Sequence, residues 1–294
     1  MHDIKIGTLV YAYKATELIP QLIPHGFETF SLTFWEKTKG IDFKELAQQV
    51  NGKLNGTDCK ISSLSVFGDA LADNEMAQEV KDGWHKLIDA AADFGTDLVT
   101  GFTGRVTDNS VKDSIPKFKE VFTEIADHAK EKNVKIAFEN CQMGGDWYYG
   151  TWNLAFNVRA WEMMFEALDY NNVGLQWEPC HHLVQLTDPI AQLRKWTDKI
   201  FNVHGKDATV AWDVIKEHGI ASDQQYAWHR TPGFGDSNWT DIISILRMNG
   251  YKGSIDIEGY HDPVYKDDLE FTGQVRSLNY LKECRGGEYI DIHI

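Results

Sequence analysis

The chain has 294 residues, a hydrophobic fraction of 43% and a net charge of −15. A chain of this length and composition can bury a large core, so we expect a compact globule rather than a disordered segment. The excess of 44 acidic over 29 basic residues repels phosphate backbones and anionic lipid, which argues against nucleic-acid and membrane partners. No apolar run approaches the roughly 18 residues of a membrane span, and the N-terminus lacks a secretion signal. These features predict a cytoplasmic protein.

Strand and helix patterns alternate along the chain. Strands are expected at 4–11, 27–35, 59–67, 97–102, 134–139, 173–178, 200–204 and 254–258. Helices are expected at 17–23, 43–54, within 74–95, from about Pro116, at 160–168, 189–197, 239–248 and 269–284. Strict alternation over about 250 residues predicts a (β/α)8 TIM barrel, here as a single domain over residues 1–294. An open doubly wound sheet would need a glycine-rich phosphate loop after the first strand, and Tyr11–Lys14 supplies none.

Four expected strands carry apolar residues on one face and end in a polar residue on the other. These end residues are Glu139, Glu178, His204 and Glu258. The loops at the carboxyl ends of the strands build the active site in barrels of this type. Three carboxylates and one imidazole suit a hard divalent ion, Mn²⁺ first, with Mg²⁺, Co²⁺ and Zn²⁺ as alternatives. The pattern therefore predicts one divalent metal ion bound by all four side chains.

Three segments carry a family resemblance. Glu178-Pro179-Cys180-His181, His204-Gly205-Lys206-Asp207 and Ile255-Asp256-Ile257-Glu258 resemble motifs of the xylose-isomerase-like TIM barrels, the sugar phosphate isomerase/epimerase family. The resemblance runs over nearly the whole chain. It implies the same four-ligand ion site, with His181 in contact with bound sugar. It also implies that Glu139 and Glu258 act as acid and base on opposite faces of a ketose.

The chain departs from the family at two positions. Relatives more often carry aspartate at the position of Glu178, and the extra methylene should shift the ion slightly. Ketose 3-epimerases carry a sugar-binding arginine where this chain has Val210. The second departure argues against simple ketose 3-epimerisation.

Two loops bear on the substrate. The loop 144–152 is rich in aromatic residues, and Trp147 is our candidate for stacking on a sugar; capping the barrel or filling a subunit contact is the alternative. The insertion 219–238 contains His229 and Arg230, which either close over the site or form a surface pair. Lys206 is expected to polarise a substrate oxygen, and Asp207 to orient the ligands.

The sequence leaves several functions open. The first is isomerisation or epimerisation of a keto-sugar by a metal-dependent enzyme through an enolate. A lyase that cleaves a 3-keto-glycoside by β-elimination is the main alternative. An endonuclease of the same barrel type is remote because the segments 27–35 and 59–69 contain no histidine. A non-catalytic sugar-binding protein would leave the ligand set unexplained. We expect a small-molecule sugar substrate and a homo-oligomer, either a dimer or a tetramer.

Overall fold

The structure is a computed structural model and describes residues 3–292. Eight parallel strands form a closed barrel in the order β1-β10-β7-β6-β5-β4-β3-β2, and helices connect them. This confirms the predicted (β/α)8 TIM barrel. The barrel strands are β1 (Lys5–Tyr11), β2 (Thr29–Thr33), β3 (Lys60–Val66), β4 (Leu98–Gly101), β5 (Lys135–Glu139), β6 (Val173–Trp177), β7 (Ile200–Gly205) and β10 (Ser254–Ile257).

The helices differ from the predicted ones at a few places. They are α1 (Ala15–Leu22), α2 (Phe43–Leu54), α3 (Glu75–Ala90), α4 (Val111–Glu131), α5 (Val158–Ala167), α6 (Cys180–Val184), α7 (Pro189–Trp196), α8 (Trp212–His218), α9 (Trp239–Met248) and α10 (Glu270–Cys284). Helix α4 begins before Pro116 because the Ser110 hydroxyl caps it by accepting a hydrogen bond from Asp113 N. Helices α6 and α8 were not predicted.

Internal contacts divide the chain into two compact units. The N-terminal unit comprises Leu9–Trp177 and Lys199–Asn202. The C-terminal unit comprises Glu178–Asp198, the chain from Val203 onward, and the start of β1 up to Thr8. The single domain over residues 1–294 stays a prediction.

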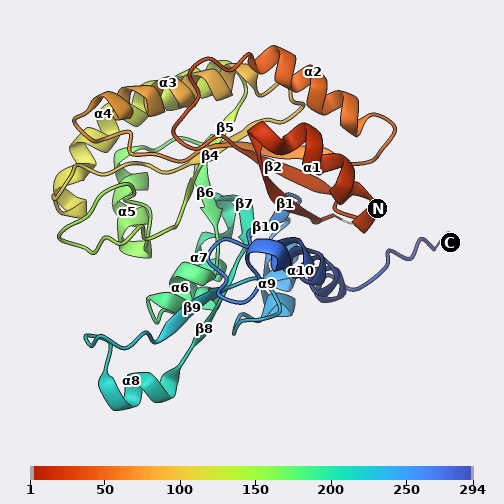
Figure 1. Ribbon diagram of the computed structural model, residues 1–294. Coiled ribbons are helices and arrows are strands. Elements are labelled where there is room, and N and C mark those ends of the chain that lie inside the picture. The colour runs from red at the N-terminus through yellow and green to blue at the C-terminus, as the bar shows by residue number, and fades with distance from the viewer. Residues whose placement is uncertain (1–2, 293–294) are drawn as a thin grey trace. The chain divides into compact units, whose positions relative to one another are not determined.

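The N-terminal unit packs helices against the parallel strands β2 to β6. Figure 1 shows α2, α3 and α4 along the outside of these strands. The fully buried Trp84 of α3 contacts the rings of Phe122 on α4 and Phe138 on β5, with centroids 5.6 and 6.0 Å away. Phe138 therefore faces the helices, and alternation turns its neighbour Glu139 toward the other face of β5.

In the C-terminal unit, β10 pairs with both β1 and β7. The pairing sets Asp256 beside His204, and Glu258 N continues the ladder by donating to Gly205 O at 3.0 Å. This register brings the carboxyl ends of β7 and β10 level. The chain then reaches Glu258 directly after the last residue of β10.

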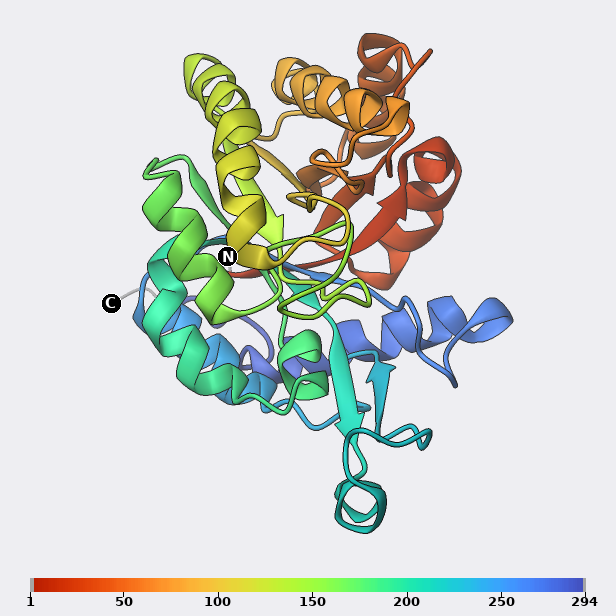
Figure 2. The same cartoon turned by 90° about the vertical axis from the view of Figure 1, so that its left-hand side faces the viewer.

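An antiparallel hairpin follows β7. It consists of β8 (Asp207–Val210) and β9 (Ala227–Arg230), with α8 between them. In Figures 1 and 2 the hairpin projects from its unit, and α8 stands at the tip. Buried Asp207 anchors its base, since its carboxylate accepts hydrogen bonds from Ser237 N and Trp239 Nε1 at 3.0 Å each. The predicted insertion 219–238 thus contains β9, while β8 and α8 of the hairpin precede it in the chain.

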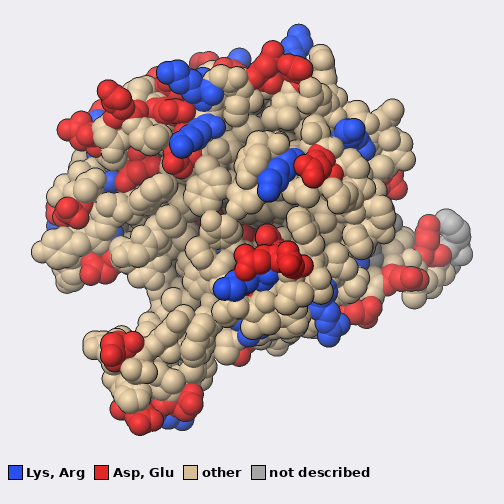
Figure 3. All heavy atoms as spheres, in the orientation of Figure 1, with Lys and Arg blue, Asp and Glu red and all other residues tan. Residues whose placement is uncertain are grey.

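Many acidic side chains lie on the surface. Figure 3 shows Asp and Glu residues over α3 and α4 and at the hairpin tip. This agrees with the net charge of −15. None of the helices within residues 3–292 has the length and apolar character needed to cross a membrane.

Glycine at the end of β4 gives a test of the packing. A Cβ on Gly101 would overlap the Val66 carbonyl and lie 2.8 Å from the Trp84 ring. We expect Gly101→Ala to lower the free energy of unfolding by about 1–3 kcal/mol in urea titration. Gly52→Ala is the matched control in α2, where a Cβ meets nothing within 4 Å. It should raise stability by about 0.5–1 kcal/mol, and equal losses in both variants would contradict this packing.

Candidate active site

Three of the four predicted metal ligands lie together in the C-terminal unit. Glu178 and His204 are fully buried, and Glu258 is 12% exposed. Each offers a donor atom, and these atoms lie within 4.8 Å of one another. His204 Nδ1 is 3.0 Å from Glu258 Oε2. Two oxygen donors and one nitrogen donor at this spacing could hold a metal ion.

Lys206 lies beside this cluster. Its side chain is 3% exposed, and Nζ donates a hydrogen bond to Glu258 Oε1 at 2.6 Å. Burial opposes ionisation of Glu258, but the Lys206 ammonium and the His204 imidazole outweigh it and hold the pKa of Glu258 below its ordinary value. Glu258 is therefore a carboxylate at neutral pH.

The pKa of Glu178 is shifted in the opposite direction. Burial raises the pKa of Glu178 to about 7; the Lys206 ammonium opposes this shift, and the charge of Glu258 adds to it. His181, in the first turn of α6, has Nε2 2.7 Å from Glu178 Oε1. The structure thus brings the predicted sugar-binding His181 next to a predicted ligand.

His229 belongs to the same group of side chains. Its ring packs edge-to-face against His181 at 5.1 Å and against His261 at 5.7 Å between centroids. Burial lowers the pKa of His229 to about 3, and the charge of Lys206 adds to this shift. At neutral pH His229 is therefore an uncharged imidazole, which donates a hydrogen bond from one ring nitrogen and accepts one at the other.

Arg230 points away from His229, because successive residues of a strand face opposite sides. Its Nε lies 3.3 Å from Asp262 Oδ2, and its guanidinium lies 5.8 Å from the centroid of the Phe234 ring. Asp262 is buried and also accepts hydrogen bonds from the backbone N of Thr231 at 2.9 Å and Tyr265 at 2.9 Å. Substrate binding by Arg230 stays a prediction, and Asp262 is a structural anchor that the sequence pattern did not reveal.

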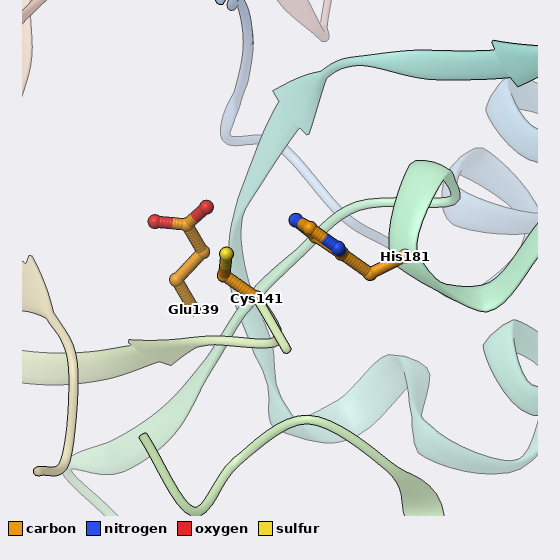
Figure 4. Close-up of side chains that lie close together, drawn as sticks. All are labelled: Glu139, Cys141 and His181. Atoms are coloured by element: carbon orange, nitrogen blue, oxygen red, sulfur yellow. The ribbon is translucent and has the colours of Figure 1, made fainter. Parts of the chain in front are cut away.

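Glu139 is the last residue of β5, in the N-terminal unit, and is buried. Its carboxylate and the Cys141 thiol have donor atoms within 4.8 Å of each other. Figure 4 shows both side chains leaving the end of β5, and His181 on α6. The Asn153 side-chain amide donates to the carbonyls of Glu139 and Cys141 at 2.8 and 2.7 Å, which fixes the start of the aromatic loop.

Two polar residues that the sequence analysis missed hold the aromatic loop. Arg105 is fully buried, and its guanidinium donates to the carbonyls of Asn109 at 2.9 Å and Trp147 at 3.2 Å. Asp69 accepts hydrogen bonds from Arg105 N at 2.8 Å and Trp152 N at 2.7 Å. The structure involves the backbone of Trp147 in this anchoring, and stacking of its ring on sugar stays a prediction.

Known proteins match this chain over about half of its length. The inosose dehydratase of Clostridium tetani is 27% identical over 160 residues. The match covers 53% of this chain, which thus spans about half (49%) of that relative's length.

Solved structures match over nearly the whole chain. The 3-keto-D-glucoside 4-epimerase of E. coli has a TM-score of 0.71 at 14% identity, covering 96% of this chain and 100% of that one. The IolI protein with a bound zinc atom has a TM-score of 0.63 at 17% identity, covering 96% of each chain. At these identities the likeness concerns the fold. A family model matches residues 22–284, and the chain therefore belongs to the xylose isomerase-like TIM barrel family.

Proposed function

We propose that this protein is a divalent-metal-dependent isomerase or epimerase that acts on a keto-sugar through an enolate. The observation that carries the proposal is the buried cluster of Glu178, His204 and Glu258, with donor atoms within 4.8 Å of one another. The family supports it, as does the structural similarity to a 3-keto-D-glucoside 4-epimerase. A sugar is the proposed small-molecule partner. A dimer or tetramer and a cytoplasmic location stay predictions.

The charges in the cluster support a divalent cation, with Glu139 proposed as the fourth ligand. Glu178 and Glu258 are two carboxylates beside one ammonium, and burial raises the pKa of Glu178 to about 7. Further positive charge would favour the ionised form of Glu178. The proposed ligands lie at or directly after the carboxyl ends of β5, β6, β7 and β10. We propose Mn²⁺, with Zn²⁺ as the alternative that the zinc of IolI suggests.

The proton transfers are proposed for Glu258 and Glu139. Lys206 and His204 keep Glu258 ionised, so it can accept a proton from the carbon next to the substrate carbonyl. Lys206 Nζ, 2.6 Å from Glu258 Oε1, can donate to a substrate oxygen near that carbon. Glu139, in its protonated form, then donates its proton on the opposite face of the sugar and becomes a carboxylate. A bound divalent ion would stabilise the negative charge on the enolate oxygen.

Elimination from the same enolate is the second candidate. The relative named inosose dehydratase favours it. An enolate with a leaving group on the adjacent carbon can expel that group, whether it is water or the oxygen of a glycoside. The same side chains would remove the first proton in either reaction, so only the products distinguish elimination from isomerisation or epimerisation.

Solvent exchange tests the proposed function. Protein loaded with Mn²⁺ is incubated in D₂O with a panel of keto-sugars, inososes and 3-keto-glycosides, and the products are followed by NMR. We expect deuterium at the carbon next to the carbonyl with the carbon skeleton preserved. Loss of water or of an aglycone would favour elimination. Absence of exchange across the panel would contradict enolate chemistry altogether.

The variant Glu258→Gln tests the proton acceptor. The amide keeps the shape of the side chain but cannot take a proton, so we expect turnover to fall by about 10²- to 10⁴-fold. The control is Glu288→Gln, at an exposed position near the end of the chain, which should turn over substrate at the normal rate. Normal turnover in Glu258→Gln would refute the assignment.

Metal removal tests the ligand set. We expect chelation to lower the melting temperature and Mn²⁺ to restore it, because at about 100 times its Kd a ligand of the folded state adds about 2.7 kcal/mol. His204→Ala should lose this response. His218→Ala removes an exposed histidine of α8 and should keep it. A response that survives in His204→Ala would place the ion elsewhere.

A further inference from the structure

Six apolar side chains gather at the carboxyl ends of strands β2 to β5. Phe67, Phe102 and Cys141 are buried, and the partly buried Trp35, Met143 and Trp152 pack against them. The Phe67 ring lies 5.7 Å from the Trp35 ring and 4.8 Å from the Phe102 ring, between centroids. We call Trp35, Met143 and Trp152 the apolar platform. It lies entirely in the N-terminal unit.

All three platform residues have a left-handed backbone. Their φ angles are 52° at Trp35, 48° at Met143 and 72° at Trp152. Large side chains rarely adopt this conformation, which persists only where the surrounding structure enforces it. Such strained residues cluster at binding and catalytic sites. Ordinary core packing does not require three of them in one group.

Hydrogen bonds fix the backbone of the platform at Trp152. Asp69 Oδ2 accepts from Trp152 N at 2.7 Å, and Asp69 Oδ1 accepts from Arg105 N at 2.8 Å. The Arg105 guanidinium fits against Gly145 and Gly150, where a Cβ would come within 3.1 and 2.6 Å of Nη1. Gly145 and Gly150 therefore leave room for the Arg105 side chain. A surface fixed in advance loses little entropy when a ligand binds.

The platform lies close to a proposed catalytic group. Cys141 packs beneath it, and the Cys141 thiol and the Glu139 carboxylate have donor atoms within 4.8 Å of each other. One side chain thus separates the platform from the residue proposed to return the proton. A substrate bound at Glu139 would extend over this surface.

We propose that the platform binds a flat apolar ring attached to the sugar, so that the substrate is a keto-glycoside with an aromatic aglycone rather than a free sugar. This inference rests on the proposed function, since it names the substrate class of the same site. A free sugar would set its hydroxyls against tryptophan and methionine side chains, which offer them few hydrogen-bond acceptors. An aromatic ring can stack there without losing hydrogen bonds to water.

The test is a comparison of matched ligands by calorimetry. The 4-nitrophenyl and methyl glycosides of glucose, galactose and xylose are titrated into the full chain. We expect the aryl member of at least one pair to bind about tenfold more tightly. Trp152→Ala should reduce that ratio to less than about twofold and leave the affinity for the methyl glycoside unchanged. Met143→Ala provides a second variant if Trp152→Ala does not fold, and it should also lower the ratio.

Trp212→Ala is the matched control, since it removes a tryptophan that is 54% exposed on α8. It should keep the tenfold ratio. Equal affinities in every pair, no measurable binding of any aryl glycoside, or a ratio unchanged in both platform variants would overturn the proposal. Binding requires no turnover, so deuterium exchange can fail while the ratio stands, and the two proposals can be judged separately.

Discussion

Burying carboxylates close together is the constraint that shapes the site. Glu178 and Glu258 lie within a few ångströms of each other in a water-poor environment, where an unpaired charge is costly. Lys206 and His204 supply the positive charge that keeps Glu258 ionised, while Glu178 retains a pKa raised to about 7. The compensation is thus incomplete within the C-terminal unit. A cluster of this kind is suited to bind a cation. Burial of these carboxylates destabilises the fold, and groups with such shifted pKa values are typical of active sites.

Much of this arrangement could be predicted from alternation along strands. The pairing of β7 with β10 brings His204 and Glu258 to neighbouring strand ends, and the parity of each strand turns both residues to one face. Lys206 could be singled out because it follows the ligand histidine closely. Its partner could not, since residues 206 and 258 are far apart in the chain and only the register of the folded strands joins them.

Other features lay beyond sequence reasoning for physical reasons. Strands β8 and β9 are short, and α8 lies between them in the chain. Neither strand therefore shows an alternation of apolar and polar residues long enough to predict a hairpin. Asp262 and Asp69 are single aspartates in loops, where most aspartates are solvated, and their roles arise from backbone groups that no residue pattern encodes. Arg105 is a buried arginine whose partners are carbonyl oxygens, so complementary charges in the sequence give no sign of it. The sequence pattern singles out the aromatic loop, in which Trp152 packs on Phe67, Phe102 and Cys141, and stacking of Trp147 on a sugar stays a prediction.

The difference between those two tryptophans follows from the backbone. Trp152 has a φ of 72°, which costs about 1–3 kcal/mol for a residue with a side chain. A hydrogen bond to a charged acceptor contributes about 1.5–3 kcal/mol, and Trp152 N donates one to Asp69 at 2.7 Å. The two terms are of equal size, so a single carboxylate from the loop after β3 is enough to hold the indole in an orientation that the loop alone would not adopt. The strain therefore makes the position of the ring depend on Asp69. The geometry of the apolar platform therefore depends on the loops after β3, β4 and β5 together, and not on the aromatic loop alone.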